Sequence, residues 1–122
     1  MLSSMTPTIV ENENNDLFLV LGSPGGSTII TTVTQILVNV IDFKMSLKEA
    51  VENKRFHHQW LPDVIQTERY SFSPDLTKAL SKYGHKVKER SSIGEANCIM
   101  VDALGLKHAC SDSRRGGVSV AY

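Results

Sequence analysis

The sequence predicts an α+β fold, in which strands and helices are mixed without a regular βαβ alternation. Three observations support this class: a strand pair near the N-terminal end, a long helix-spaced segment after it, and a second strand pair near the C-terminal end. With 122 residues, of which 41% are hydrophobic, the chain can bury one ordinary core. We therefore expect one segment over residues 1–122 and no more than one domain.

Composition excludes several classes of partner. The 13 basic and 13 acidic side chains cancel, so net charge does not direct the chain toward nucleic acid or an anionic membrane. No apolar run reaches the roughly 18 residues that span a bilayer. Residues 1–5 lack the basic start and long apolar centre of a signal peptide, which leaves open a signal further upstream in a longer chain.

The first two extended segments predict a hairpin. Thr8–Val10 and Leu17–Leu21 are apolar, and the intervening residues 11–16 are polar and rich in Asn. Short apolar runs bounded by such turn residues are typical of paired antiparallel strands.

The segment Ser27–Phe43 predicts a helix, although its Ile, Val and Thr content favours a strand by propensity. Spacing decides, because the run is too long for one strand and its apolar residues fall on one helical face. These residues are Ile29, Ile30, Val33, Ile36, Leu37, Val40 and Ile41. The opposite face is polar but nearly uncharged, unlike most water-facing helices; it carries Thr28, Thr31, Thr32, Gln35, Asn39 and Asp42. We therefore expect another layer to cover that face.

Two shorter helices carry clear start signals. Ser46 and Glu49 match a capping box, which predicts a helix from Leu47 to about Asn53. The run Ser73-Pro74-Asp75 predicts a second helix that ends at Gly84. Its expected apolar stripe consists of Leu76, Ala79, Leu80 and Tyr83.

The remaining segments are extended. Residues 55–69 mix strand and loop character around Pro62, and residues 86–90 predict a charged edge strand. Residues 96–112 predict a hairpin closed at 103–105, with Gly105 in the left-handed conformation. Cys98 and Cys110 lie symmetrically in this hairpin and could face each other. Two buried free thiols are the favoured interpretation over a disulfide, since free Cys is commonly buried.

A glycine-rich turn, Gly22-Ser23-Pro24-Gly25-Gly26, joins the second strand to the long helix. Backbone N–H groups of Gly25 and Gly26, reinforced by the positive end of the helix, would form an oxyanion hole or a phosphate nest. The Lys-Ser/Thr pair of a P-loop is absent, and the spacing of a dinucleotide fingerprint is not met. Taken alone, the turn fits a purely structural role equally well.

Other polar residues are less specific. The hydroxyls of Ser3 and Ser4 could both donate to a carboxylate, although a frayed polar terminus is the simpler interpretation. His57 and His58 are adjacent in an extended stretch, so their side chains point to opposite faces. With no metal-ligand spacing, we expect no metal and no cofactor. Packing and hydrogen bonding are the expected roles of these histidines and of Arg114.

Taken together and in order, the motifs resemble the small subunit of γ-glutamyltranspeptidases. The resemblance is carried by residues 2–10, by the glycine turn 21–27, by the run Arg55-Phe-His-His-Gln-Trp-Leu-Pro-Asp63 and by the ending Ser111–Arg115 with a final Ala121-Tyr122. It covers essentially the whole chain, and four motifs in register are more specific than any one of them.

The resemblance implies part of an αββα N-terminal-nucleophile hydrolase sandwich. In that family a precursor cleaves itself, and the new N-terminal threonine of the small subunit attacks the γ-glutamyl bond of a substrate such as glutathione. The γ-glutamyl group then passes to water or to an amino acid or peptide. By this resemblance, Ser3 and Ser4 would bind the substrate α-carboxylate, and the N–H groups of Gly25 and Gly26 would form the oxyanion hole.

The chain also departs from the family pattern. The nucleophile threonine, the residues that hold the substrate amine and the arginine of the large subunit all lie upstream of its first residue. We therefore expect the C-terminal portion of a small subunit, not a complete catalytic domain, that is inactive alone. Its partners would be the large subunit and the upstream part of the small subunit, in an enzyme of the periplasm or cell surface. The alternatives are a non-catalytic binding or scaffold module of the same fold, and a relative acting on poly-γ-glutamate or acylated β-lactams.

Overall fold

The computed structural model describes residues 5–120, which form two compact units. Residues 5–53 and 94–120 make the first unit, and Lys54–Ile93 make the second. Among the described residues, no helix is long and apolar enough to cross a bilayer.

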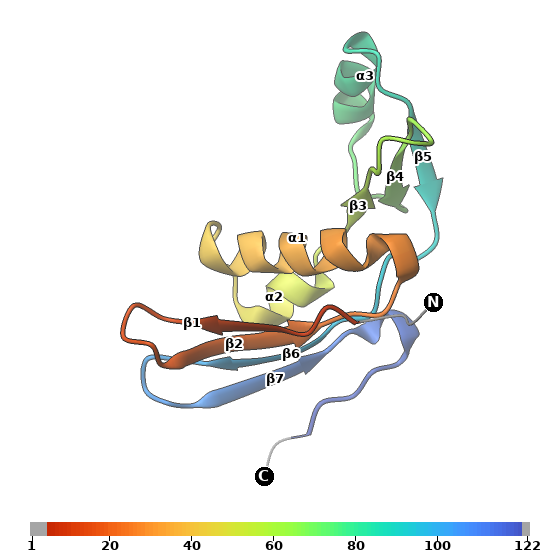
Figure 1. The fold of residues 1–122 in the computed structure, drawn as a ribbon. Helices are drawn as coiled ribbons and strands as arrows, with labels where there is room; N and C mark the ends of the chain where they lie inside the picture. Colours follow the sequence, from red (N-terminus) through yellow and green to blue (C-terminus); the bar gives the residue numbers. More distant parts are fainter. Residues whose placement is uncertain (1–4, 121–122) are drawn as a thin grey trace. The chain divides into compact units, whose positions relative to one another are not determined.

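The first unit is built on a four-stranded antiparallel sheet (Figure 1). Its strands are β1 (Thr8–Glu11), β2 (Leu17–Gly22), β6 (Asn97–Val101) and β7 (Lys107–Ser111), in the order β1-β2-β6-β7. Both predicted hairpins are confirmed, because β1 pairs with β2 and β6 pairs with β7. Gly105 has a φ of 78°, the left-handed conformation expected of the second turn.

One face of this sheet is covered by helices. A short 3₁₀ turn, η1 (Gly26–Thr28), leads into α1 (Ile29–Ile41), and α2 (Leu47–Glu52) follows (Figure 1). The capping box is present, with Ser46 accepting from the N–H of Glu49 and Glu49 bonding back to Ser46. The core between the layers comprises Leu19, Leu21, Val33, Ile36, Val40, Leu47, Ala50, Val51, Ala96 and Cys98.

The other face of the sheet carries an apolar row that no helix of the described unit covers. Strand register aligns four residues as direct partners across the sheet: Ile9, Val20, Ile99 and Ala109. Ile9 is 69% exposed and Ile99 is 46% exposed. In the described part of this unit, both helices lie on the opposite face (Figure 1).

The predicted faces of the long helix are partly wrong. Ile30 and Ile41 are exposed, although their spacing assigned them to the buried face. On the polar face, Thr28 and Thr32 are buried, as expected of a face that is covered. At Thr32 the cover comes from the chain itself, because a Cβ placed on Gly94 would lie only 2.5 Å from the Thr32 hydroxyl oxygen. The chain's own Gly94 segment, rather than a further layer, lies against Thr32.

The second unit contains a three-stranded sheet and one helix. Its strands are β3 (Phe56–His57), β4 (Ile65–Glu68) and β5 (Val87–Arg90), in that order, with β4 and β5 parallel. The helix α3 (Pro74–Lys82) joins the two parallel strands and is capped by Ser73, which accepts from the N–H of Leu76. The charged edge strand is confirmed.

The expected apolar stripe of α3 is not buried in the described structure. No residue of the helix is buried, and Leu76 and Tyr83 are 44% and 84% exposed.

A buried carboxylate closes the second unit. Glu68 accepts hydrogen bonds from the N–H groups of Arg55 (3.0 Å) and Ile93 (2.8 Å), and the Arg55 guanidinium donates to the Ile93 carbonyl. Because Arg55 and Ile93 lie at the two ends of the unit, these bonds hold its first and last segments together.

Candidate functional site

The glycine turn leaves the end of β2 with two unusual backbone conformations. Gly25 has φ 148° and ψ 9°, and Gly26 has φ 59°. A Cβ on Gly25 would lie 2.6 Å from the Thr28 hydroxyl oxygen, so a side chain there collides as well as being strained. A Cβ on Gly26 would meet no atom within 4 Å. Gly25 is therefore required sterically, and Gly26 by its conformation alone.

The two glycine N–H groups form a donor pair. A ψ near zero at Gly25 nearly eclipses its own nitrogen with that of Gly26, so both N–H groups lie on one side of the residue. Among the described residues neither N–H has a hydrogen-bond acceptor, and both glycines are exposed. They also precede η1 and α1, whose N-terminal end carries partial positive charge. The arrangement suits a small anion or a developing oxyanion.

Two buried hydroxyls support this turn. The Ser23 hydroxyl, completely buried, donates to the Pro24 carbonyl at 2.8 Å and accepts from the N–H of Glu95 at 2.9 Å. The Thr28 hydroxyl donates to the Gly25 carbonyl at 2.9 Å, and the N–H of Thr28 donates to the same oxygen at 3.2 Å. The sequence pattern did not single out either hydroxyl.

The segment before β1 lies at the base of the turn. The N–H of Ser23 donates to the Met5 carbonyl at 2.9 Å, and a Cβ on Gly22 would contact that same carbonyl oxygen at 3.3 Å. Ser3 and Ser4, the predicted carboxylate-binding residues, lie outside the described residues.

A second polar cluster, centred on Arg114, closes the C-terminal end of α2. The Arg114 guanidinium donates to the carbonyls of Val51 (3.0 Å) and Asn53 (2.7 Å), and forms an ion pair with Asp112 at 3.0 Å. Asp112 is fully buried and also accepts from the N–H of Ala96. We call this cluster the C-terminal clasp. The sequence predicted only packing and hydrogen bonding for Arg114, which is confirmed.

The histidines make local pairs. His57 bonds to Gln59 at 2.9 Å, His58 to Asp63 at 3.1 Å, and His108 to Asp102 at 2.9 Å. The His108 ring and the N–H of Leu106 hold the pKa of Asp102 below its usual value. Over residues 5–120, no group of three or more His, Cys, Asp or Glu side chains could hold a metal ion.

Cys98 and Cys110 are direct cross-strand partners and both are free thiols. The ladder bonds from Asp112 to Ala96 and from Asp102 to Leu106 place them at a hydrogen-bonded pair, where Cα atoms are about 5.5 Å apart. Burial, with the carboxylates of Glu52 and Asp112, raises the pKa of the Cys110 thiol. The prediction of free thiols is confirmed, but only Cys98 is buried, whereas Cys110 is half-buried.

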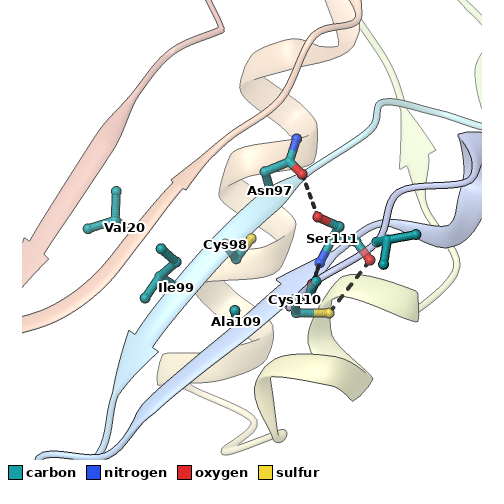
Figure 2. A pocket seen from close by; sticks show the side chains of 9 residues that line it. Val20, Asn97, Cys98, Ile99, Ala109, Cys110 and Ser111 are labelled. Carbon is teal, nitrogen blue, oxygen red and sulfur yellow. Dashed lines mark hydrogen bonds between the residues drawn. The ribbon is translucent and has the colours of Figure 1, made fainter. Parts of the chain in front are cut away.

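A pocket of about 280 Å³ lies on this hairpin (Figure 2), and Val118 and Ser119 of the C-terminal segment contribute to its lining. The Ser119 hydroxyl accepts from the N–H of Ser111 there. The lining is mostly apolar and contains no charged side chain: Val20, Asn97, Cys98, Ile99, Ala109, Cys110, Ser111, Val118 and Ser119. The pocket therefore offers nothing to balance an anionic substrate, unlike the glycine turn.

Sequence comparison places the chain among known proteins. A sequence profile of the family described as Gamma-glutamyltranspeptidase matches residues 1–122. The glutathione hydrolase proenzyme of Escherichia coli K12 is 49% identical over 93% of this chain and 19% of its own length. The chain thus spans about a fifth of that relative.

Solved structures give the same picture. An acivicin-inhibited γ-glutamyltranspeptidase superposes with a TM-score of 0.87 at 45% identity, over 93% of this chain and 62% of its own. The γ-glutamyltranspeptidase of Pseudomonas nitroreducens gives 0.89 at 37% identity, over all of this chain and 64% of its own. The fold is therefore that of part of the N-terminal-nucleophile hydrolase sandwich.

Proposed function

Since the chain belongs to the γ-glutamyltranspeptidase family, we propose that the complete protein cleaves γ-glutamyl amide bonds of the glutathione type. It transfers the γ-glutamyl group to water or to an amino acid or peptide. This chain supplies the oxyanion hole through the N–H groups of Gly25 and Gly26. The observation that carries the proposal is that this donor pair has no acceptor among the described residues, in a chain that the family profile matches throughout.

The chemistry follows from the charge that develops during acyl transfer. When a nucleophile attacks the γ-glutamyl carbonyl, negative charge gathers on the carbonyl oxygen. Two fixed N–H donors at the start of a helix stabilise that oxygen more than the neutral carbonyl of the substrate, which lowers the barrier. The turn has no positively charged side chain among its own residues, so backbone dipoles do this work.

We assign binding of the substrate α-carboxylate to Ser3 and Ser4. The support is positional: the Met5 carbonyl is bonded to the N–H of Ser23 at the base of the turn, and Ser4 is joined to Met5 by one peptide bond. In the sequence, Ser4 and Ser3 precede Met5, the residue that contacts the turn, by one and two positions.

The partners of the chain are the large subunit and the upstream part of the small subunit. The open apolar row Ile9, Val20, Ile99 and Ala109 supports this assignment, because such a face gains stability when another layer covers it. The nucleophile threonine would come from the upstream part of the small subunit. The complete enzyme is assigned to the periplasm or the cell surface, and this chain alone is inactive.

The test uses the complete protein with a chromogenic γ-glutamyl anilide, with and without a dipeptide acceptor. We expect anilide release that the acceptor accelerates, an acyl-enzyme detectable by intact mass, and no turnover by residues 1–122 alone. A complete protein that carries the family threonine but gives neither product nor acyl-enzyme would reject the proposal and favour a non-catalytic module. Preference for poly-γ-glutamate or an acylated β-lactam over glutathione would change the substrate assignment only.

A further inference from the structure

We propose that Ser23 and Thr28 are positioning residues that aim the two N–H donors of the glycine turn. Each hydroxyl holds one carbonyl oxygen, and each of those carbonyls belongs to the same peptide unit as one of the donors. The inference rests on the proposed function, because it explains how the same turn is kept ready for an oxyanion.

Ser23 aims the first donor. In a planar trans peptide, the carbonyl oxygen and the amide hydrogen point in opposite directions. The carbonyl of Pro24 and the N–H of Gly25 share one such peptide, so the 2.8 Å bond from the Ser23 hydroxyl to the Pro24 oxygen turns the Gly25 N–H the other way. The donor then points away from the buried Ser23 side chain.

The direction of the Ser23 hydroxyl is itself fixed. A hydroxyl has one hydrogen and two acceptor lone pairs. Because the N–H of Glu95 donates to this oxygen at 2.9 Å, its own hydrogen is left for the Pro24 carbonyl. Gly94 allows this contact, since a Cβ there would lie 2.9 Å from the Ser23 oxygen and 2.5 Å from the hydroxyl of Thr32.

Thr28 aims the second donor by the same rule. The carbonyl of Gly25 and the N–H of Gly26 share the next peptide, and the Gly25 oxygen accepts both the hydroxyl and the N–H of Thr28. Thr28 is 4% exposed, so water competes little for these bonds. With both peptides held, the ψ of 9° at Gly25 is maintained and the donors stay side by side.

The experiment compares Ser23→Ala, Thr28→Val and Thr28→Ser in the complete protein. Losing one oxyanion donor typically lowers kcat about 100- to 1,000-fold. A donor that is present but no longer held in one orientation should lower kcat less, by about 10- to 100-fold. We expect that loss for Ser23→Ala and a smaller one for Thr28→Val, which keeps its backbone bond. KM for the anilide and inhibition by free glutamate should stay unchanged. Thr28→Ser, which restores the hydroxyl, should recover most of kcat.

Two control variants distinguish a loss of donor orientation from a general loss of stability. Ser46→Ala removes the cap of α2 and lowers stability without touching the turn, and Thr34→Val removes an exposed hydroxyl from α1 itself. Both should keep the kcat of the parent protein. Equal kcat in Ser23→Ala and the parent, or a loss in Ser46→Ala as large as in Ser23→Ala, would overturn the inference.

A crystal structure of Ser23→Ala adds a readout that does not need activity. We expect the Pro24–Gly25 peptide to rotate, so that the Gly25 N–H leaves the side it shares with the Gly26 N–H. An unrotated peptide would overturn the inference. An inactive parent protein would instead reject the proposed function, while the peptide orientation would still decide the positioning by Ser23.

Discussion

Two helix ends in the first unit differ in whether the chain itself pairs their free backbone groups. At the N-terminal end of η1 and α1, the N–H groups of Gly25 and Gly26 have no acceptor among the described residues. At the C-terminal end of α2, the carbonyls of Val51 and Asn53 both accept from one guanidinium, that of Arg114.

The difference shows that the fold pairs the backbone groups of one helix end from within the chain, whereas the two donors at the other end stay exposed. Unpaired backbone groups at a helix end cost stability unless water, a side chain or a ligand pairs with them. The C-terminal clasp supplies that pairing from within the chain. In the glycine turn, the hydroxyls of Ser23 and Thr28 bond to two carbonyls, while the two N–H donors stay exposed. Substitutions at the two ends should therefore affect different quantities.

The largest expected effect is on catalysis, from Gly25→Ala. A methyl group there would collide with the Thr28 hydroxyl oxygen and would disfavour φ 148°, so the donor pair should be lost. In the complete protein we expect kcat for the anilide to fall by about 100- to 1,000-fold, the cost of a missing oxyanion donor. Gly105→Ala is the matched control. Gly105 also has a positive φ, but a Cβ there would meet no atom within 4 Å, and the residue lies in the turn between β6 and β7, away from the glycine turn. A similar kcat for both variants would contradict the comparison.

The next effect is on stability, from Arg114→Met. This change leaves the Asp112 carboxylate, whose side chain is fully buried, without its cation. Breaking a buried pair by removing one partner typically costs about 3–5 kcal/mol. Arg115→Met is the matched control, since Arg115 is 61% exposed and its contact with Glu95 is 3.9 Å long. We expect a large fall in the urea midpoint of unfolding for Arg114→Met and almost none for Arg115→Met. Equal midpoints would show that the clasp does not stabilise the helix end.

A smaller effect concerns the start of α2, the end opposite the clasp. Ser46→Ala removes the side-chain acceptor for the N–H of Glu49, which should cost about 1 kcal/mol. Ser73→Ala does the same to α3 in the second unit. We expect similar losses of unfolding free energy by denaturant titration for both caps. A loss from Ser46→Ala as large as from Arg114→Met would mean that both ends of α2 are held equally, contrary to the structure.

The smallest effect is a pH dependence at the same cap. Hydrogen bonds from the Ser46 hydroxyl and N–H lower the pKa of Glu49 below its ordinary value of 4.5. A depressed pKa in the folded state adds stability above pH 4.5, and that stability is lost as pH falls through the folded pKa. The stability difference between the parent and Glu49→Gln should therefore shrink in acid. A difference that stays constant from pH 7 to pH 3 would contradict this assignment.

Local signals made much of the fold predictable. Both hairpins, the capping box at Ser46, the Ser73 cap and the left-handed Gly105 depend on residues within a few positions of each other. The faces of the long helix were not predictable in the same way. Periodicity gives the direction in which each side chain points, but the burial of Thr32 also depends on the close approach of Gly94, which lies 62 positions further along the chain.

The sequence by itself determined that a glycine-rich turn joins a strand to a helix, because the positive φ angles of this turn are a local property that glycine adopts without strain. Tertiary structure alone decided how the turn is held. Ser23 meets Glu95 across 72 positions of sequence, and Arg114 reaches the Val51 carbonyl across 63. No short-range pattern encodes such contacts, because they form only when distant strands pair. In this fold, β2 from the first half of the chain pairs with β6 from the second half, and β6 pairs with β7.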